Sequence, residues 1–193
     1  MKALPNALIL CTALVAGCKE KAQEPKIELP AATQEGKETG GCFIDGEAWR
    51  NSPTSGLFGS ATGMFALVNK KAGQNTYVIS IGISSDNPSR EVSFRCLKAT
   101  GVGIYPFTVK VPAHGPVPEP DYARYRNNSG NGPKGEFITG PTATGQLEIT
   151  YFDLQKNVIA GRFFFVGQDS VSSRRVSLSD GRFDTKFAYM EFP

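Results

Sequence analysis

The chain has 193 residues, with 21 Lys and Arg against 18 Asp and Glu, and carries a formal net charge of +3. Forty per cent of the residues are hydrophobic, which is enough for one globular domain with its own core. The near balance of charge gives no support for a nucleic-acid-binding protein, and no Lys/Arg cluster is interleaved with aromatic residues in the way that a stacking platform requires.

The N-terminus has the features of an export signal. Lys2 supplies a positive start, and residues 7–16 form an apolar run, which is too short for a transmembrane helix of about 20 residues. Residues 14–18 then read LVAGC. This pattern resembles the lipobox of bacterial lipoproteins, which implies removal of residues 1–17 and acyl chains on Cys18. Two or more acyl chains anchor a protein stably in a membrane.

A charged segment follows the cysteine. Residues 19–40 read KEKAQEPKIELPAATQEGKETG and hold no aromatic side chain. Such a composition buries too little apolar surface to offset the entropy lost on ordering. Residues 18–40 are therefore predicted to form the lipidated cysteine and a flexible tether. Aromatic residues and turn signals recur from residue 41 to residue 193, which are expected to form a single β domain.

Within this domain the apolar residues alternate with a period of two, as in half-buried β-strands. Strands are expected at residues 77–83, 92–97, 146–151, 158–166, 176–178 and 182–187. Turns are expected at Asp45-Gly46, at residues 153–157 and at Asp180-Gly181, where an Asp-Gly pair between alternating runs is typical of a hairpin. The predicted fold is all-β and antiparallel, with about seven to nine strands. A β-sandwich and, as the alternative, a small calycin-like β-barrel both fit.

The cysteines allow one further prediction. Cys11 would leave with the signal peptide and Cys18 would carry lipid, so that Cys42 and Cys96 remain. Disulfides persist in compartments outside the inner membrane, and we therefore expect a bridge between Cys42 and Cys96. The alternative is two buried free thiols that pack as small hydrophobic side chains.

Residues 112–141 depart from the strand pattern. They hold six prolines, and an irregular stretch of this length is often functional. Residue types that dominate recognition hot spots occur there at Tyr122, Arg124, Tyr125 and Arg126. These four residues are predicted to form a binding loop. The alternative is a loop that packs its tyrosines against the rest of the domain.

Three segments carry a recognisable series of motifs. Residues 44–49 read IDGEAW, residues 145–165 read GQLEITYFDLQKNVIAGRFFF, and residues 176–184 read VSLSDGRFD. The series resembles a family of Gram-negative lipoproteins of unknown function, with Ile-Thr-x-x-Asp, Ile-Ser-Gly-Thr-Phe-x-Phe and Asp-Gly-x-Phe-Asp motifs. The departures are Ala160 and Arg162, where Ser and Thr are usual. The resemblance implies a lipid-anchored β domain outside the inner membrane, and it brings no catalytic residues.

Few residues suggest chemistry. His114 is the one histidine of the chain and lies among prolines and glycines, which form a poor base for a catalytic device. One histidine and two distant cysteines do not predict a metal site, and no nucleotide-binding motif occurs. A carboxylate-based hydrolase stays open as an alternative, because geometry decides whether acidic residues form a pair. The acidic residues concerned are Asp45, Glu47, Asp180 and Asp184.

These observations favour a non-enzymatic protein without a cofactor or metal. We expect a monomer anchored to the outer membrane through Cys18, on its periplasmic or its cell-surface face, because the Asp that usually signals inner-membrane retention is absent after this cysteine. The expected role is a binding or accessory module for a protein or glycan, with no nucleic-acid partner. A structural envelope lipoprotein is the first alternative, and the hydrolase is the second.

Overall fold

The computed structural model describes residues 27–52, 54–56, 59–86, 89–108, 121–129, 132–169 and 171–193, and Cys18 and His114 lie outside them. All regular elements of the described residues are strands. They are β1 (Thr39–Ile44), β2 (Glu47–Arg50), β3 (Thr54–Gly56), β4 (Gly59–Ala61), β5 (Met64–Lys71), β6 (Tyr77–Asp86), β7 (Ser89–Ala99), β8 (Gly103–Phe107), β9 (Tyr122–Asn127), β10 (Gly135–Ile138), β11 (Gly145–Asp153), β12 (Val158–Asp169), β13 (Arg175–Lys186) and β14 (Ala188–Phe192).

Twelve of these strands belong to one sheet, and β3 and β4 form a separate hairpin. The order in the large sheet is β14-β5-β6-β7-β9-β10-β12-β13-β1-β2. β12 also pairs with β11, which in turn pairs with β8, so the sheet branches at β12. Every pairing in this sheet is antiparallel except the one between β14 and β5.

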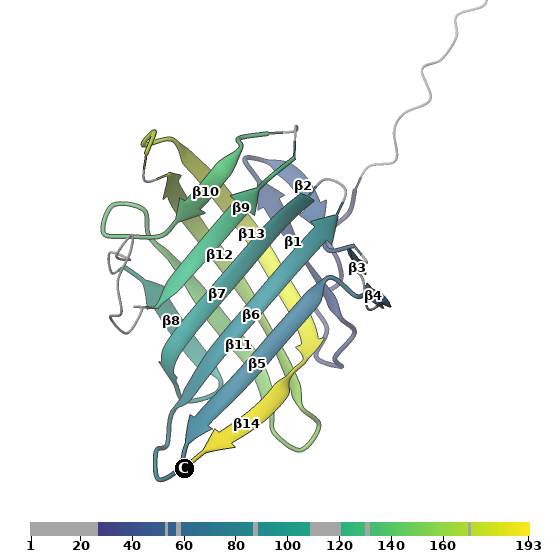
Figure 1. The fold of residues 1–193 in the computed structure, drawn as a ribbon, viewed down its shortest axis with the longest axis vertical. Coiled ribbons are helices and arrows are strands. Elements are labelled where there is room, and N and C mark those ends of the chain that lie inside the picture. The colour runs from purple at the N-terminus through teal and green to yellow at the C-terminus, as the bar shows by residue number, and fades with distance from the viewer. Residues whose placement is uncertain are drawn as a thin grey trace, which may run out of the picture.

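The sheet curls around one core. β14 follows β13 after the single residue Phe187 and pairs with β5. Because β14 and β5 stand first in the strand order, this connection brings them close to β13, which stands late in the order. Figure 1 shows β5, β6, β7 and β9 crossing in front of β11, β12 and β13. The all-β, mainly antiparallel prediction is confirmed, in a form between a sandwich and an open barrel. The described residues form fourteen strands, more than the expected seven to nine. Several of them, such as β3 and β4, are too short to show a period of two in the sequence.

Inward-facing phenylalanines connect the two crossing layers. Phe94 of β7 packs against Phe163 and Phe165 of β12, with ring centroids 4.6 and 6.1 Å apart. It also packs against Phe107 of β8, with a centroid distance of 6.2 Å. All four side chains are buried. Offset and edge contacts at such distances stabilise a core beyond the simple burial of apolar area.

The Asp180-Gly181 pair does not reverse the chain. β13 continues through it, and the register with β12 shifts between Phe163 and Phe165. Asp180 has a φ of 50°, a left-handed conformation that suits a β-bulge. Gly181 faces the ring of Phe163, where an added β-carbon would lie 2.4 Å from ring carbons. The predicted hairpin is therefore wrong, and the pair forms a bulge within one long strand.

The other two predicted turns are confirmed. Asp45 and Gly46 connect β1 to β2, with φ values of 49° and 86°. Residues 154–157 connect β11 to β12. In that turn, the Asp153 carboxylate accepts hydrogen bonds from the backbone N–H groups of Gln155 and Lys156, at 2.9 and 3.0 Å. This is the local arrangement for which Asp is favoured in turns.

Part of the predicted tether lies on the sheet. The buried carboxylate of Asp184, on β13, accepts three hydrogen bonds from the segment that precedes β1. The donors are the hydroxyl of Thr33 at 2.6 Å and the backbone N–H groups of Glu35 and Gly36 at 3.0 and 2.6 Å. A flexible tether therefore cannot extend over all of residues 18–40, because its second half is fastened to the domain.

Candidate functional site

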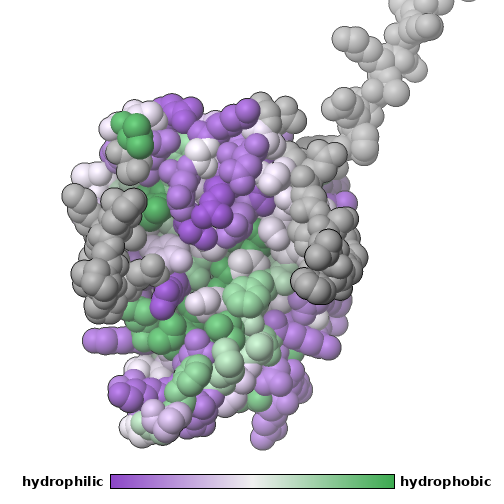
Figure 2. All heavy atoms as spheres, viewed as in Figure 1, coloured by the Kyte–Doolittle hydropathy of each residue, from purple (hydrophilic) through white to green (hydrophobic). Residues whose placement is uncertain are grey.

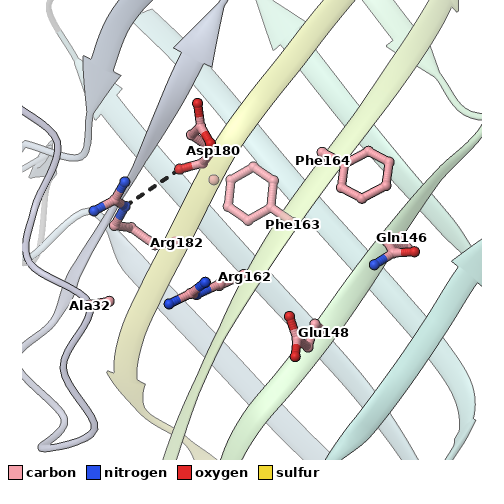
Figure 3. A pocket seen from close by; sticks show the side chains of 9 residues that line it. Ala32, Gln146, Glu148, Arg162, Phe163, Phe164, Asp180 and Arg182 are labelled. Atoms are coloured by element: carbon pink, nitrogen blue, oxygen red, sulfur yellow. Dashed lines mark hydrogen bonds between the residues drawn. The ribbon is translucent and has the colours of Figure 1, made fainter.

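Two shallow pockets lie on the outer face of β11, β12 and β13 (Figure 3). Their volumes are about 290 and 320 Å³, and both are lined by Ala32, Glu148 and Arg162. Such volumes fall at the small end of the range for ligand-binding sites. We call this region the trough, and we define it by the side chains of Gln146, Glu148, Arg162, Phe164, Asp180 and Arg182.

Strand alternation and register place these side chains together. On β12, Arg162 and Phe164 are exposed, between buried residues that face the core. Gln146 of β11 lies directly opposite Phe164, and Glu148 lies opposite Arg162. On the other side of β12, Arg182 of β13 lies opposite Arg162. Side chains from three adjacent strands therefore meet on one outer face of the sheet.

The bulge in β13 shapes one side of the trough. A regular strand turns every second side chain inward, but Ser179 and Asp180 are both exposed. The extra residue lets Leu178 and Phe183 stay in the core while Asp180 and Arg182 line the trough. Bulges often re-aim side chains next to functional sites in this way.

Arg162 and Arg182 form a pair of like charges. Directly opposed residues on antiparallel strands have Cα atoms about 4.5–5.5 Å apart, where like charges destabilise the sheet. Arg182 donates a hydrogen bond to the backbone oxygen of Asp180 at 3.4 Å (Figure 3) and another to that of Pro30 at 3.4 Å. Within the described part of the chain, no carboxylate lies within ion-pair distance of either guanidinium. The two positive charges are therefore available to a ligand.

The residues of the predicted binding loop lie elsewhere. Tyr122, Arg124, Tyr125 and Arg126 all belong to β9, which pairs with β7 and β10. Tyr125 is fully buried and stacks on Phe137, with ring centroids 6.0 Å apart. The loop prediction is wrong because inward and outward positions alternate along this run as they do in any strand. A buried Tyr125 cannot touch a partner.

The arginines of β9 neutralise two glutamates. Arg124 contacts Glu91 of β7 at 3.1 Å and Glu136 of β10 at 3.2 Å, and Arg126 contacts both at 3.5 Å. Figure 2 shows the hydrophilic surface over this part of the sheet. Burial lowers the pKa of Arg124, but the nearby Tyr122, Glu91 and Glu136 raise it by more. This charge network is complete in itself, in contrast to the trough.

The predicted disulfide is wrong, because Cys42 and Cys96 are free thiols buried in the core. Cys42 lies opposite Trp49, whose Nε1 donates a hydrogen bond to Ser85 of β6, whereas Cys96 lies opposite Ile79 of the same strand. Ser85 and Ile79 are six residues apart on β6, about 20 Å along the strand. The two thiols thus lie at different levels of the interior, and a bridge needs Cα atoms within about 7 Å. Burial raises both pKa values, that of Cys96 to about 12.

The four acidic residues considered for hydrolysis occupy separate places. Asp45 lies in the turn between β1 and β2, and Glu47 lies 3.9 Å from Arg90. Asp184 is buried beneath the segment that precedes β1, where its oxygens accept the hydrogen bonds described above. Asp180 alone lines the trough. The fold therefore does not assemble these four carboxylates into one site.

The sequence patterns do not single out the trough, because polar residues are expected at outward positions of a strand. Two signals are nevertheless present. Strand alternation places Phe164, the middle one of three consecutive phenylalanines, on the face opposite to that of the buried Phe163 and Phe165, and there it is 50% exposed. The second is Arg162, which departs from the Thr that the resemblance given under sequence analysis leads us to expect there.

Within the described residues, no helix has the length and apolar character needed to cross a membrane. The same residues contain no group of three or more His, Cys, Asp or Glu that could hold a metal ion. Comparison with known proteins found no matching family model, no matching curated protein and no matching solved structure.

Proposed function

We propose that this protein is a lipid-anchored, non-enzymatic binding module of the bacterial outer membrane, and that its ligand occupies the trough. The anchor rests on residues 14–18, whose lipobox pattern lies outside the described residues. Acyl chains on Cys18 would hold the domain at one face of the membrane. The separate positions of the four acidic residues support a binding role rather than hydrolysis.

The observation that carries the binding role is the setting of Phe164. This side chain is 50% exposed and lies at a pocket with Gln146, Glu148 and Arg162. A ligand that covers the ring would gain apolar burial, at about 25 cal/mol per Å², while the neighbouring polar side chains orient it. Small-molecule sites combine apolar or aromatic side chains with a few placed polar groups, and the trough offers one exposed ring beside several polar groups.

The test is a binding screen with the full-length protein in a nonionic detergent, probed against arrays of glycans and of envelope peptides. Wild-type protein should retain a defined set of ligands, and Phe164→Ala should lose them. Phe65→Ala is the matched control, because Phe65 is 57% exposed on β5, away from the trough. A screen without any ligand, or equal retention by the Phe164→Ala variant, contradicts the proposal and favours a structural envelope protein.

A further inference from the structure

We infer that the trough recognises an acidic saccharide, with a sugar ring on Phe164 and the carboxylate of the sugar between Arg162 and Arg182. This inference rests on the proposed function, since it names the chemistry of the ligand at the same site. Three features of the described residues carry it: the charge of the trough, the spacing of its groups, and the wall on one side.

The charge argument starts from one row of side chains across three strands. Glu148, Arg162 and Arg182 follow one another from β11 to β13, so this row carries one negative and two positive charges, while Asp180 adds a second carboxylate to the trough beside the row. The next position in the row, on β1, is Gly41, which offers no acidic side chain. Glu148 balances at most one of these two positive charges, so an anion placed between the two arginines would relieve the repulsion between them.

The arginines of β9 have a structural role and differ from those of the trough in their ion pairs. Arg124 and Arg126 each contact two glutamates at 3.5 Å or less. Arg126 lies directly opposite Glu91 on β7 and Glu136 on β10, and Arg124 reaches the same two glutamates diagonally. Among the described residues, Arg182 has no acidic side chain directly opposite it, and its guanidinium donates to backbone oxygens at 3.4 Å. The difference indicates that the pair in the trough serves a partner from outside the chain.

The spacing of the groups fits a ring that carries a carboxylate. Two guanidinium groups on opposed residues can converge on one carboxylate, which arginine binds through paired N–H donors. Phe164 lies two residues from Arg162 on β12, about 7 Å along the strand on the same face. Gln146, opposite Phe164, offers both a donor and an acceptor to sugar hydroxyls. Figure 3 shows Arg162 and Arg182 on one side of the trough and Phe164 with Gln146 on the other.

The wall comes from the segment that precedes β1. Ala32 lines both pockets, and the Pro30 oxygen accepts a hydrogen bond from Arg182. Because Asp184 fastens this segment to β13, the wall and the arginine are held together. A wall on one side and an open face on the other suit a sugar that enters edge-on, with its carboxylate pointing towards the wall.

The test is isothermal titration of the full-length protein in nonionic detergent with tetragalacturonate and with its fully methyl-esterified form, which has the same rings without charge. The acid should bind about tenfold more tightly, or more, because hydrogen bonds between charged groups are lost in the ester. Arg162→Gln and Arg182→Gln should each weaken binding of the acid about tenfold. Arg175→Gln should leave binding of the acid unchanged, because Arg175 is exposed on β13 about 23 Å from Arg182 along the strand.

The Glu148→Gln variant controls for loss of binding by misfolding. This variant removes the acidic neighbour of Arg162 and should tighten binding of the acid several-fold, which a damaged fold cannot do. Added salt should weaken binding of the acid and leave binding of the ester unchanged. A triglutamate peptide is the competing anion, and binding of the peptide as tight as that of the acid overturns the saccharide assignment.

The remaining outcomes separate this inference from the proposed function. Equal binding of the acid and its ester, with both lost in Phe164→Ala, overturns charge recognition but keeps the trough as a binding site. Binding of neither form, while Phe164-dependent ligands are found on the arrays, also overturns the acidic saccharide alone. An equal loss of affinity in Arg175→Gln overturns the role of the arginine pair. Failure of every ligand, on the arrays and in titration, overturns both.

Discussion

Replacing Asp184 with Asn should weaken the attachment of the segment that precedes β1. The Asp184 carboxylate is 1% exposed and accepts hydrogen bonds from Thr33, Glu35 and Gly36 at 2.6, 3.0 and 2.6 Å. An amide keeps one acceptor oxygen and turns an NH2 group towards the other donors. Thr33 and Glu35 donate to one carboxylate oxygen, and Gly36 donates to the other. The variant therefore leaves one or two of these three donors without an acceptor.

The size of the effect follows from these contacts. A hydrogen bond to a charged group contributes about 1.5–3 kcal/mol, so losing two of them would cost about 3–6 kcal/mol if the segment stayed in place. The segment can instead detach locally and let its N–H groups reach water, which limits the loss. We expect the free energy of unfolding to fall by about 2–4 kcal/mol. With a urea m-value of about 2 kcal/mol/M, the midpoint should fall by about 1–2 M.

The loss should depend on pH. Burial raises the pKa of Asp184, but the hydrogen bonds from Thr33 and from the backbone of Glu35 and Gly36 outweigh it and lower the pKa overall. A folded-state pKa below the unfolded value of about 3.9 stabilises the fold above that pH. This contribution is lost as the pH falls through the folded-state pKa. The difference between wild type and variant should therefore be full at pH 7 and shrink below about pH 4.

The assay is urea unfolding of the full-length protein at pH 7 and at pH 3. Asp180→Asn is the control, because Asp180 is an exposed aspartate on the same strand and Asn tolerates its positive φ. We expect its free energy of unfolding to change by less than about 0.5 kcal/mol. Equal midpoints for wild type and Asp184→Asn at pH 7, or a difference between them that does not shrink at pH 3, would refute the reasoning.

Three further predictions follow from the core and the anchor. Gly181→Ala should cost about 1–3 kcal/mol of stability, because its β-carbon would collide with Phe163, and an unchanged thermal midpoint would contradict this. Cys42 and Cys96 should resist iodoacetamide at pH 8 without reductant, since both are buried and protonated. After unfolding, mass spectrometry should show both alkylated, whereas a disulfide would block the reaction. Cys18→Ala should move the protein out of the membrane fraction, and unchanged lipid labelling would exclude that anchor.

The two Asp-Gly pairs show how far local sequence predicts structure. Asp45 and Asp180 adopt nearly the same φ, 49° and 50°, so the local conformation is predictable in both cases. The first pair turns the chain, whereas the second lies within β13, which pairs with β12 on one side and β1 on the other. A reversal at Asp180 would lose both sets of hydrogen bonds. The dipeptide determines the dihedral angles, and the neighbouring strands determine whether the chain turns.

Residues 122–126 form a strand rather than the predicted loop for a related reason. Prolines flank residues 122–127. The composition of the surrounding thirty residues is typical of a loop, and it obscures the six residues whose side chains alternate between inward and outward positions. Ala123, Tyr125 and Asn127 of these six residues face inward and are buried. A strand as short as β9 is stabilised chiefly by its pairing with β7 and β10, and pairing between distant segments cannot be read from local composition.

The trough depends on register, which the sequence does not reveal. Arg162 and Arg182 are twenty residues apart, and they oppose each other only because the bulge at Asp180 shifts the pairing of β12 with β13. One residue more or less would turn one of the two side chains towards the core. The placement of Phe164 on the face opposite to that of Phe163 and Phe165 follows from strand alternation. The arginine and amide neighbours of Phe164 require the three-dimensional structure.

The most direct test of the account is amide chemical-shift mapping of the isotope-labelled protein in nonionic detergent during titration with tetragalacturonate. The account predicts perturbations centred on Gln146, Arg162, Phe164 and Arg182, with the amides of β9 unchanged. Perturbations centred on β9 and its charge network, with none at the trough, would contradict the account. Such a result would place the ligand on β9, whose residues the sequence analysis predicts as the binding region.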